Sequence, residues 1–193
     1  MRKIEPSIFN ENQYWNEKYK IQTVKLLPGD YYVSANNEMI VTLLGSCVSA
    51  CIRDRQTLVG GMNHFTLPCL QSNYKSPKRL EYEALVEYGS LVMSQLIDEI
   101  LQKGGKRENL EAKIFGGADM GSFSKYDLGK YNVMFLKKYL LEQDIPVLST
   151  DIGDTWSRKV YFVPSTGDAY VKKIERKNNQ KVFDREILYS DKI

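Results

Sequence analysis

Short apolar segments separated by turn-forming residues recur along most of the chain, and this pattern constrains the fold more than any other sequence feature. Segments of about four to eight apolar and β-branched residues, bounded by Gly, Pro, Asn or Asp, are typical of strands. We expect strands at residues 22–27, 31–35, 39–44, 58–65, 110–115, 145–149, 160–163 and 169–174. Segment 48–53 is apolar enough for a buried strand or a short helix, and its periodicity does not decide between them.

Two longer segments have the periodicity of amphipathic helices. In residues 79–103, apolar side chains recur at spacings of three and four, namely Leu85, Tyr88, Val92, Leu96 and Ile100. A Gly-Gly pair at 104–105 is expected to end this helix. A second helix is expected at 130–142, with Val133, Leu136 and Leu140 facing inward. Many strands with few helices predict a layered α+β domain.

Composition restricts the class of protein and its environment. The chain has 193 residues, 42% hydrophobic and 26% charged, which is ordinary for one globular domain. A net charge of +3 gives no argument for a nucleic-acid partner. No apolar run reaches the roughly 18 residues that span a bilayer, and the first 20 residues lack a secretory apolar region. We therefore expect a cytoplasmic protein without membrane insertion. Its three cysteines are too few and odd in number for a disulfide scaffold.

The residues with the clearest chemical potential are a cysteine in a tight turn and the only histidine of the chain. Cys47 ends a Gly-Ser-Cys turn at 45–47, directly after an expected strand, and His64 lies on the next apolar segment. A free thiol has a pKa near 8.5, so it needs a neighbouring base to become a nucleophile at neutral pH. A thiol and an imidazole on rigid neighbouring elements indicate a cysteine hydrolase.

The residues around the cysteine suit the same chemistry. Gly45 lacks a Cβ, so substrate can approach the backbone closely, and the amides of Ser46 and Cys47 are candidate donors to an oxyanion. Thr42, on the strand before the turn, could orient the imidazole through its hydroxyl or its carbonyl. From residue type alone, an ordinary strand residue is the simpler interpretation of Thr42.

Structural interpretations also exist for Cys47 as a small buried hydrophobe and for His64 as a hydrogen-bonded core residue. The Asn63-His64 pair places polar groups inside an apolar segment, a cost that a purely structural strand usually avoids. A zinc site is a further alternative, with Cys47 and Cys51 spaced like one ligand pair and His64 and Cys69 like another. Their strongly apolar surroundings argue against it.

The glycine-rich segment 116–121 follows an expected strand but does not match a phosphate-binding loop. It has neither the Gly-x-Gly-x-x-Gly spacing nor a following Lys-Ser/Thr pair. We therefore expect a turn packed near the candidate active centre.

Three motifs in this order resemble the CheD family of chemoreceptor glutamine deamidases. They are TLLGSCV at 42–48, GGMNHFTLP at 60–68 and AKIFGGADM at 112–120. Further matches are LPGD at 27–30, Asn132-Val133 at the second helix, IPV at 145–147 and RKVYF at 158–162. The resemblance covers residues 22–176, which leaves residues 1–21 as an N-terminal extension and 177–193 as a C-terminal tail. In place of the family's Gly-Gly…Gly-Arg turn, this chain has Asp154 and Ser157 within segment 151–158.

The resemblance implies a layered sandwich of mixed β-sheets flanked by α-helices, related to cysteine-hydrolase toxins. It implies hydrolysis of receptor glutamines to glutamate and ammonia without a cofactor or a metal. Cys47 would be the nucleophile, His64 the acid and base, and Thr42 the third catalytic residue. The implied partners are the cytoplasmic helices of methyl-accepting chemoreceptors and a CheC-like phosphatase of the response regulator CheY. The alternative is a mainly non-catalytic regulatory partner of such a phosphatase.

Overall fold

The computed structural model of this chain describes residues 1–3, 12–67, 79–121 and 127–190. Its helices are α1 (Arg79–Gln102), α2 (Leu128–Glu142) and α3 (Asn179–Ser190), with short 3-10 turns at Arg107–Asn109 and Arg176–Asn178. Its strands are β1 (Arg2–Lys3), β2 (Gln13–Asn16), β3 (Ile21–Lys25), β4 (Asp30–Ser34), β5 (Met39–Leu44), β6 (Val48–Asp54), β7 (Gly60–Asn63), β8 (Leu110–Gly116), β9 (Val147–Ile152), β10 (Arg158–Val163) and β11 (Asp168–Lys173).

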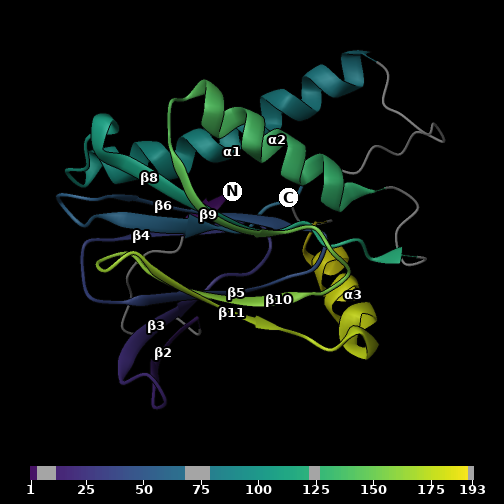
Figure 1. Cartoon of the computed structure of the whole chain (residues 1–193), viewed down its shortest axis with the longest axis horizontal. Helices are drawn as coiled ribbons and strands as arrows, with labels where there is room; N and C mark the ends of the chain where they lie inside the picture. The colour runs from purple at the N-terminus through teal and green to yellow at the C-terminus, as the bar shows by residue number, and fades with distance from the viewer. Residues whose placement is uncertain (4–11, 68–78, 122–126, 191–193) are drawn as a thin grey trace.

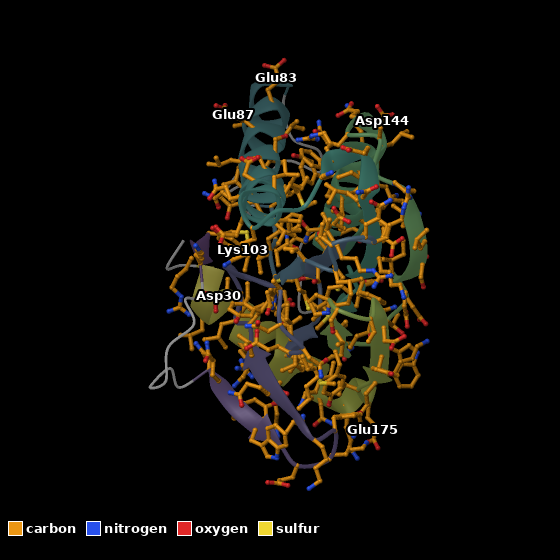
Figure 2. All side chains as sticks on the ribbon, turned by 90° about the vertical axis from the view of Figure 1, so that its left-hand side faces the viewer. Asp30, Glu83, Glu87, Lys103, Asp144 and Glu175 are labelled. Carbon is orange, nitrogen blue, oxygen red and sulfur yellow. The ribbon has the colours of Figure 1, made fainter. Side chains whose placement is uncertain are left out.

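The strands form two mixed sheets, which confirms the expected α+β layered arrangement. One sheet has the order β1-β4-β7-β6-β8-β9, and the other has the order β11-β10-β5-β3-β2. Each sheet combines antiparallel pairs with parallel ones, such as β8 with β9 and β3 with β5. Helices α1 and α2 cover the outer face of the six-stranded sheet, and the five-stranded sheet packs against its other face (Figure 1). The helical layer and Glu175, next to α3, lie at opposite ends of the side view (Figure 2).

The layers enclose two apolar cores. One lies between the helices and the six-stranded sheet and includes Leu96 and Ile100 of α1, Leu136 and Leu140 of α2 and Ile52 of β6. The other lies between the sheets, and Cys47 and Cys51 belong to it. Burial on both faces explains why β6 is mostly apolar from Val48 to Ile52, because a central strand packs against a layer on each side.

Most elements agree with the sequence expectations, and β6 resolves the ambiguous segment as a strand. Strand β7 is shorter than expected because Leu58 has a φ of 63° in the preceding turn, where regular pairing is not possible. Strand β9 starts two residues late because Ile145 closes the end of α2, its N–H donating to the Leu140 carbonyl at 3.0 Å. Helix α3 was not expected; it lies at one end of the sheets (Figure 1).

Segments from both ends of the chain join the fold. Strand β1 pairs with β4, and β2 pairs with β3. Strands β1 and β2 and helix α3 belong to the segments that the sequence resemblance leaves outside its match. Residues 4–11 of the expected N-terminal extension lie outside the described part of the chain, as do 68–78, 122–126 and 191–193.

Candidate active site

The Gly-Ser-Cys turn at 45–47 carries the chain from one sheet into the other. Strand β5 of the five-stranded sheet ends just before the turn, and β6 of the six-stranded sheet starts just after it. The turn therefore lies at one end of the core between the sheets, and the Cys47 side chain is 1% exposed. Two sheets fix the ends of this turn, which suits a site that has to hold a nucleophile in one position.

The glycine-rich segment after β8 holds this turn from the other side, as expected. The N–H of Gly117 donates to the Cys47 carbonyl at 2.7 Å, and the N–H of Ala118 donates to the Gly45 carbonyl at 2.8 Å. Gly116 has a φ of 101°, and a Cβ at this position would collide with the Cys47 carbonyl oxygen. Only glycine allows both this backbone conformation and this close approach.

Backbone pairing brings His64 beside the cysteine turn. Phe65 forms an isolated antiparallel bridge with Val48, the residue after Cys47, through hydrogen bonds of 2.9 and 3.0 Å. The His64 N–H donates to the Asp30 carbonyl at 3.0 Å. The imidazole is 1% exposed and thus fixed against the same end of the core as the thiol.

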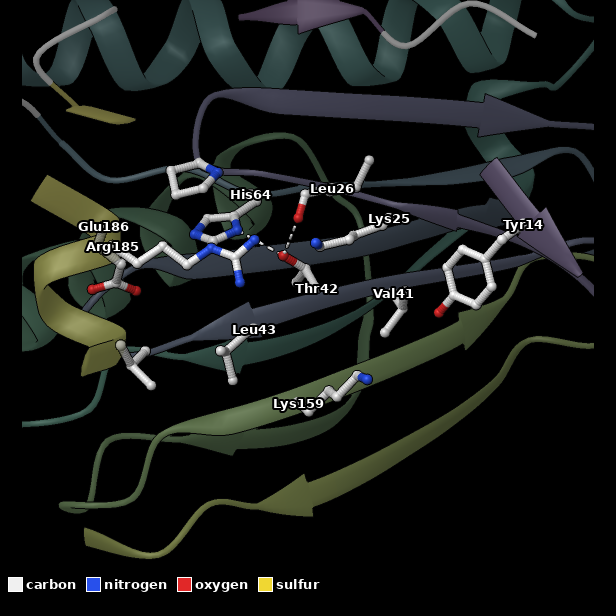
Figure 3. A pocket seen from close by; sticks show the side chains of 12 residues that line it. Tyr14, Lys25, Leu26, Val41, Thr42, Leu43, His64, Lys159, Arg185 and Glu186 are labelled. Carbon is white, nitrogen blue, oxygen red and sulfur yellow. Dashed lines mark hydrogen bonds between the residues drawn. The ribbon is translucent and has the colours of Figure 1, made fainter. Parts of the chain in front are cut away.

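The hydroxyl of Thr42 determines which nitrogen of His64 carries the proton. Its Oγ1 lies 3.0 Å from the Leu26 carbonyl oxygen and 2.7 Å from Nδ1 of His64 (Figure 3). A carbonyl can only accept, so the single hydroxyl proton goes to Leu26 and Nδ1–H of His64 donates to Thr42. The Nε2 atom consequently keeps its lone pair, and it has no hydrogen-bond partner among the described residues.

Burial and charge keep both groups neutral in this structure. Burial lowers the pKa of His64 to about 3, and the nearby Arg185 guanidinium contributes in the same direction. Burial raises the pKa of the Cys47 thiol well above its ordinary value, and the charge of Glu186 and a hydrogen bond to it raise it further. A hydrogen bond from Thr66 acts weakly in the opposite direction.

Glu186, which no sequence pattern indicated, occupies the candidate oxyanion site. Its carboxylate accepts hydrogen bonds from the N–H groups of Gly45 at 2.6 Å, Ser46 at 3.0 Å and Cys47 at 3.2 Å. It also accepts one from the Ser46 hydroxyl at 2.9 Å. These contacts show that the turn binds an oxygen anion through consecutive backbone amides. Burial nevertheless raises the pKa of Glu186, against the opposing effect of these donors.

Asn132 of α2 is a second residue whose role the sequence did not reveal. Its side-chain N–H₂ donates to the Ser46 carbonyl at 2.9 Å and to the Thr66 hydroxyl at 3.0 Å. Its carbonyl oxygen accepts from the Leu67 N–H at 2.8 Å. This buried amide thus joins the cysteine turn to the segment that carries His64. In the sequence, Asn132 belongs to the Asn132-Val133 match at the second helix, which indicates no role for its side chain.

The zinc site that the sequence offered as an alternative is not assembled among the described residues. Among the described residues, the one cluster of three metal-type ligands is Cys47, His64 and Glu186, with one atom of each within 4.8 Å of the others. Cys51 is not a member, and Cys69 lies outside the described residues. The carboxylate of Glu186 faces several N–H donors, an environment that favours an anion over a cation.

The turn that departs from the family pattern, 151–158, is organised by Arg158. This buried guanidinium donates to the Asp151 carboxylate at 2.7 Å and to the carbonyls of Trp156 and Gly153 at 2.8 and 2.7 Å. Asp154 adopts a φ of 59°, and its carbonyl accepts from the Asp119 N–H at 2.7 Å. The turn therefore packs on the glycine-rich segment that supports the cysteine turn.

A cavity of about 210 Å³ opens beside His64. Lys25, Lys159 and Arg185 line it together with Tyr14, so its charged lining is mostly positive (Figure 3). Arg185 and Glu186 both reach it from α3. The remaining lining residues come from β5, from the loop after β3, from His64 itself and from Val182 of α3.

In the described part of the chain, no helix combines the length and the apolar character needed to cross a membrane.

Comparison with known proteins identifies the family. Residues 71–173 match the family model described as CheD chemotactic sensory transduction. A protein of Janthinobacterium sp. (strain Marseille) is 40% identical over 194 residues, covering 100% of this chain and 94% of that protein. A protein of Methylobacillus flagellatus is 42% identical over 183 residues, covering 94% and 89%. Both carry the name "Probable chemoreceptor glutamine deamidase CheD". The chain therefore belongs to the CheD family.

Proposed function

We propose that this protein is a chemoreceptor glutamine deamidase that hydrolyses side-chain amides of specific receptor glutamines to glutamate and ammonia. The observation that carries the proposal is the arrangement of three groups. An oriented, neutral imidazole and a thiol lie within 4.8 Å of the carboxylate that fills an anion-binding turn. The names of the relatives support the choice of substrate.

In the first half of the proposed reaction, Sγ of Cys47 attacks the amide carbon of the glutamine. Nε2 of His64 accepts the thiol proton and passes it to the departing ammonia. The negative oxygen of the tetrahedral intermediate accepts hydrogen bonds from the N–H groups of the 45–47 turn, where Gly45 and Ser46 shape the site.

In the second half, a water molecule that loses its proton to His64 attacks the thioester and releases glutamate. General acid–base help of this kind contributes roughly 10²- to 10⁴-fold to the rate. Thr42 acts as a positioning residue, because it holds the imidazole with Nε2 free to exchange protons in both halves.

In this proposal, the protein substrate is the cytoplasmic helices of a methyl-accepting chemoreceptor. The protein accordingly acts in the cytoplasm. A reducing compartment suits the chemistry, because the thiolate is the reactive form and oxidation would remove it. Cys47 and Cys51 are both free in this structure.

Ammonia release from a cognate receptor fragment tests the proposal. Cys47→Ala removes the nucleophile, and we expect the rate to fall by at least about 10³-fold. Cys51→Ala is the matched control, since Cys51 is equally buried but is not part of the cluster. It should retain most of the activity. Equal ammonia release by wild type and Cys47→Ala would refute a cysteine-dependent deamidase.

A further inference from the structure

The side chain of Glu186 is the product of the proposed reaction, a γ-carboxylate, held at the place where that reaction would form it. Oε1 receives the N–H groups of Gly45 and Cys47, and Oε2 receives the N–H and the hydroxyl of Ser46. The Cys47 thiol also hydrogen-bonds to this carboxylate. Glu186 is 5% exposed, although the helix that carries it lies at the periphery of the fold.

Helix α3 reaches the site with one face. Asn179, Val182, Phe183 and Glu186 follow the spacing i, i+3, i+4, i+7 and are all buried. Phe183 packs against Ala118 and Met120 of the glycine-rich segment. The opposite face is exposed at Asp184 and Leu188.

The first turn of α3 is fixed by polar contacts. The Asn179 amide donates to the Thr155 carbonyl at 2.9 Å, and its oxygen accepts from the Ser157 hydroxyl at 2.8 Å. Among the described side chains of α3, only Val182 and Phe183 add large buried apolar surface. Neither side chain belongs to the two apolar cores of the sheets, so those cores do not depend on α3.

A docked α3 and a substrate glutamine require the same atoms. The carbonyl oxygen of a glutamine has to accept the N–H groups that now bind Glu186, and Sγ of Cys47 has to reach its amide carbon. Both requirements exclude the carboxylate of Glu186. A Cβ at Gly45 would lie 3.0 Å from Oε2 of Glu186, which leaves no room for a second occupant beside it.

We propose that α3 is a built-in product mimic, which closes the active site by placing Glu186 in the subsite for the substrate glutamine. Receptor helices then compete with α3 for this subsite. The proposal rests on the proposed function for the chemistry of the site. It implies that the subsite accepts a glutamine side chain presented from a helix, as α3 presents Glu186. It also implies that a glutamine at position 186 would be a substrate of the protein's own cysteine.

The test follows from that implication. In Glu186→Gln, Cys47 attacks Cδ of the new glutamine, the bond from Cδ to nitrogen breaks with release of ammonia, and water hydrolyses the thioester. The carbonyl oxygen takes the place of Oε1 and keeps the N–H donors of Gly45 and Cys47. The amide nitrogen takes the place of Oε2, where it donates to the Ser46 hydroxyl while the Ser46 N–H loses its acceptor. The net change is glutamine plus water to glutamate plus ammonia, which adds about 1 Da. Cleavage after lysine isolates position 186 in the peptide 182–192.

We expect peptide 182–192 of purified Glu186→Gln to carry glutamate, and that of the Cys47→Ala, Glu186→Gln double variant to keep glutamine. Two glutamines in the same region serve as controls that should remain unchanged. One is Gln180, which is exposed on α3, and the other is introduced by Glu175→Gln at an exposed position just before α3. The same preparations are assayed in parallel on a receptor fragment.

The outcomes separate the two proposals. If Glu186→Gln deamidates the receptor but keeps its own glutamine, the product-mimic inference is overturned and the proposed function stands. If residue 186 is converted and the receptor is not, the inference stands and the receptor as substrate is wrong. If neither glutamine changes in a folded protein, both are wrong.

A second measurement does not depend on a glutamine at position 186. Glu186→Ala should raise the rate of Cys47 alkylation by iodoacetamide at pH 7.5, and the kcat/KM for the receptor, by about 10-fold or more, because a competing occupant is gone. Asp184→Ala, at an exposed position of the same helix, should match wild type. Unchanged alkylation in Glu186→Ala would contradict closure of the site by this side chain.

Discussion

The Thr42 hydroxyl lies 2.7 Å from Nδ1 of His64 and donates its only proton to the Leu26 carbonyl 3.0 Å away. These two hydrogen bonds form a relay from His64 through Thr42 to Leu26. The relay fixes a neutral histidine with Nε2 as the free base. The carbonyl of Leu26 is part of the backbone, so one substitution at Thr42 removes the whole relay. A threonine thus orients the imidazole here, as a carboxylate or an amide does in known catalytic triads.

The first prediction concerns Thr42→Val, which keeps the shape of the side chain and removes the hydroxyl. Nδ1 of His64 then loses its acceptor, and the imidazole is free to take the other tautomer. We expect kcat for glutamine deamidation to fall by about 10- to 100-fold with little change in KM. Steady-state ammonia release checks this. Thr42→Ser keeps the hydroxyl and should retain most of the activity; equal losses in both variants would refute the relay.

The second prediction uses the pKa of His64, which is about 3 in the folded protein against an ordinary value of 6.5. The native state binds fewer protons than the unfolded state between these values, so the free energy of unfolding must fall as the pH falls below 6.5. His64→Asn removes this titration. Between pH 7 and pH 5, wild type should lose about 2 kcal/mol relative to the variant, at 1.36 kcal/mol per pH unit.

Urea denaturation of both proteins at pH 5, 6 and 7 measures this difference. Glu186 and Cys47 lie beside the imidazole and are present in both proteins, so the contributions of their own titration are shared. Parallel pH curves for wild type and His64→Asn would contradict a buried, neutral histidine.

The third prediction concerns Asn132, whose buried amide joins the cysteine turn to the histidine segment. Asn132→Leu leaves the Leu67 N–H, the Ser46 carbonyl and the Thr66 hydroxyl without this partner. Of these, the Leu67 N–H and the Ser46 carbonyl belong to buried residues. At about 1–3 kcal/mol for each unpaired buried group, we expect the free energy of unfolding to fall by about 2–6 kcal/mol. Lys137→Ala, at an exposed position of the same helix, should change it by less than about 0.5 kcal/mol. A loss below 1 kcal/mol in Asn132→Leu would show that water replaces the amide.

The fourth prediction separates backbone strain from steric conflict at the cysteine turn. Gly116 and Gly104 have φ angles of 101° and 99°, but a Cβ would strike the Cys47 carbonyl only at Gly116. Gly104→Ala should cost about 1–2 kcal/mol in stability and leave the deamidation rate unchanged. Gly116→Ala should cost more and lower kcat by at least about 10-fold, because the cysteine turn has to move. Equal effects of the two substitutions would refute a specific role of Gly116.

Local patterns in the sequence predicted most of the framework. The spacing of Leu85, Val92 and Leu96 placed α1 correctly, and the apolar segments 160–163 and 169–174 placed β10 and β11 to within two residues. The motifs around Cys47, His64 and Thr42 indicated residues that the structure brings together. These features are local, or they belong to motifs of a few residues, so they can be read without knowledge of the tertiary structure.

Contacts between distant segments could not be predicted in this way. Glu186 reaches amides about 140 positions earlier in the chain. Helix α3 has only 12 residues, a length at which an isolated helix is marginal, so its stability comes from tertiary packing. Asn132 likewise contacts residues 65 and 86 positions away. Nothing in the composition of either segment distinguishes such a contact from an ordinary solvated side chain.

Mass spectrometry of a cognate chemoreceptor cytoplasmic fragment tests the central claim most directly. The fragment is incubated with wild-type protein, with Cys47→Ala and with Cys51→Ala. The mass of each glutamine-containing peptide is then measured. The account predicts a gain of about 1 Da at specific glutamines with wild type and with Cys51→Ala, and none with Cys47→Ala. No gain with folded wild-type protein, or the same gain with Cys47→Ala, would contradict it.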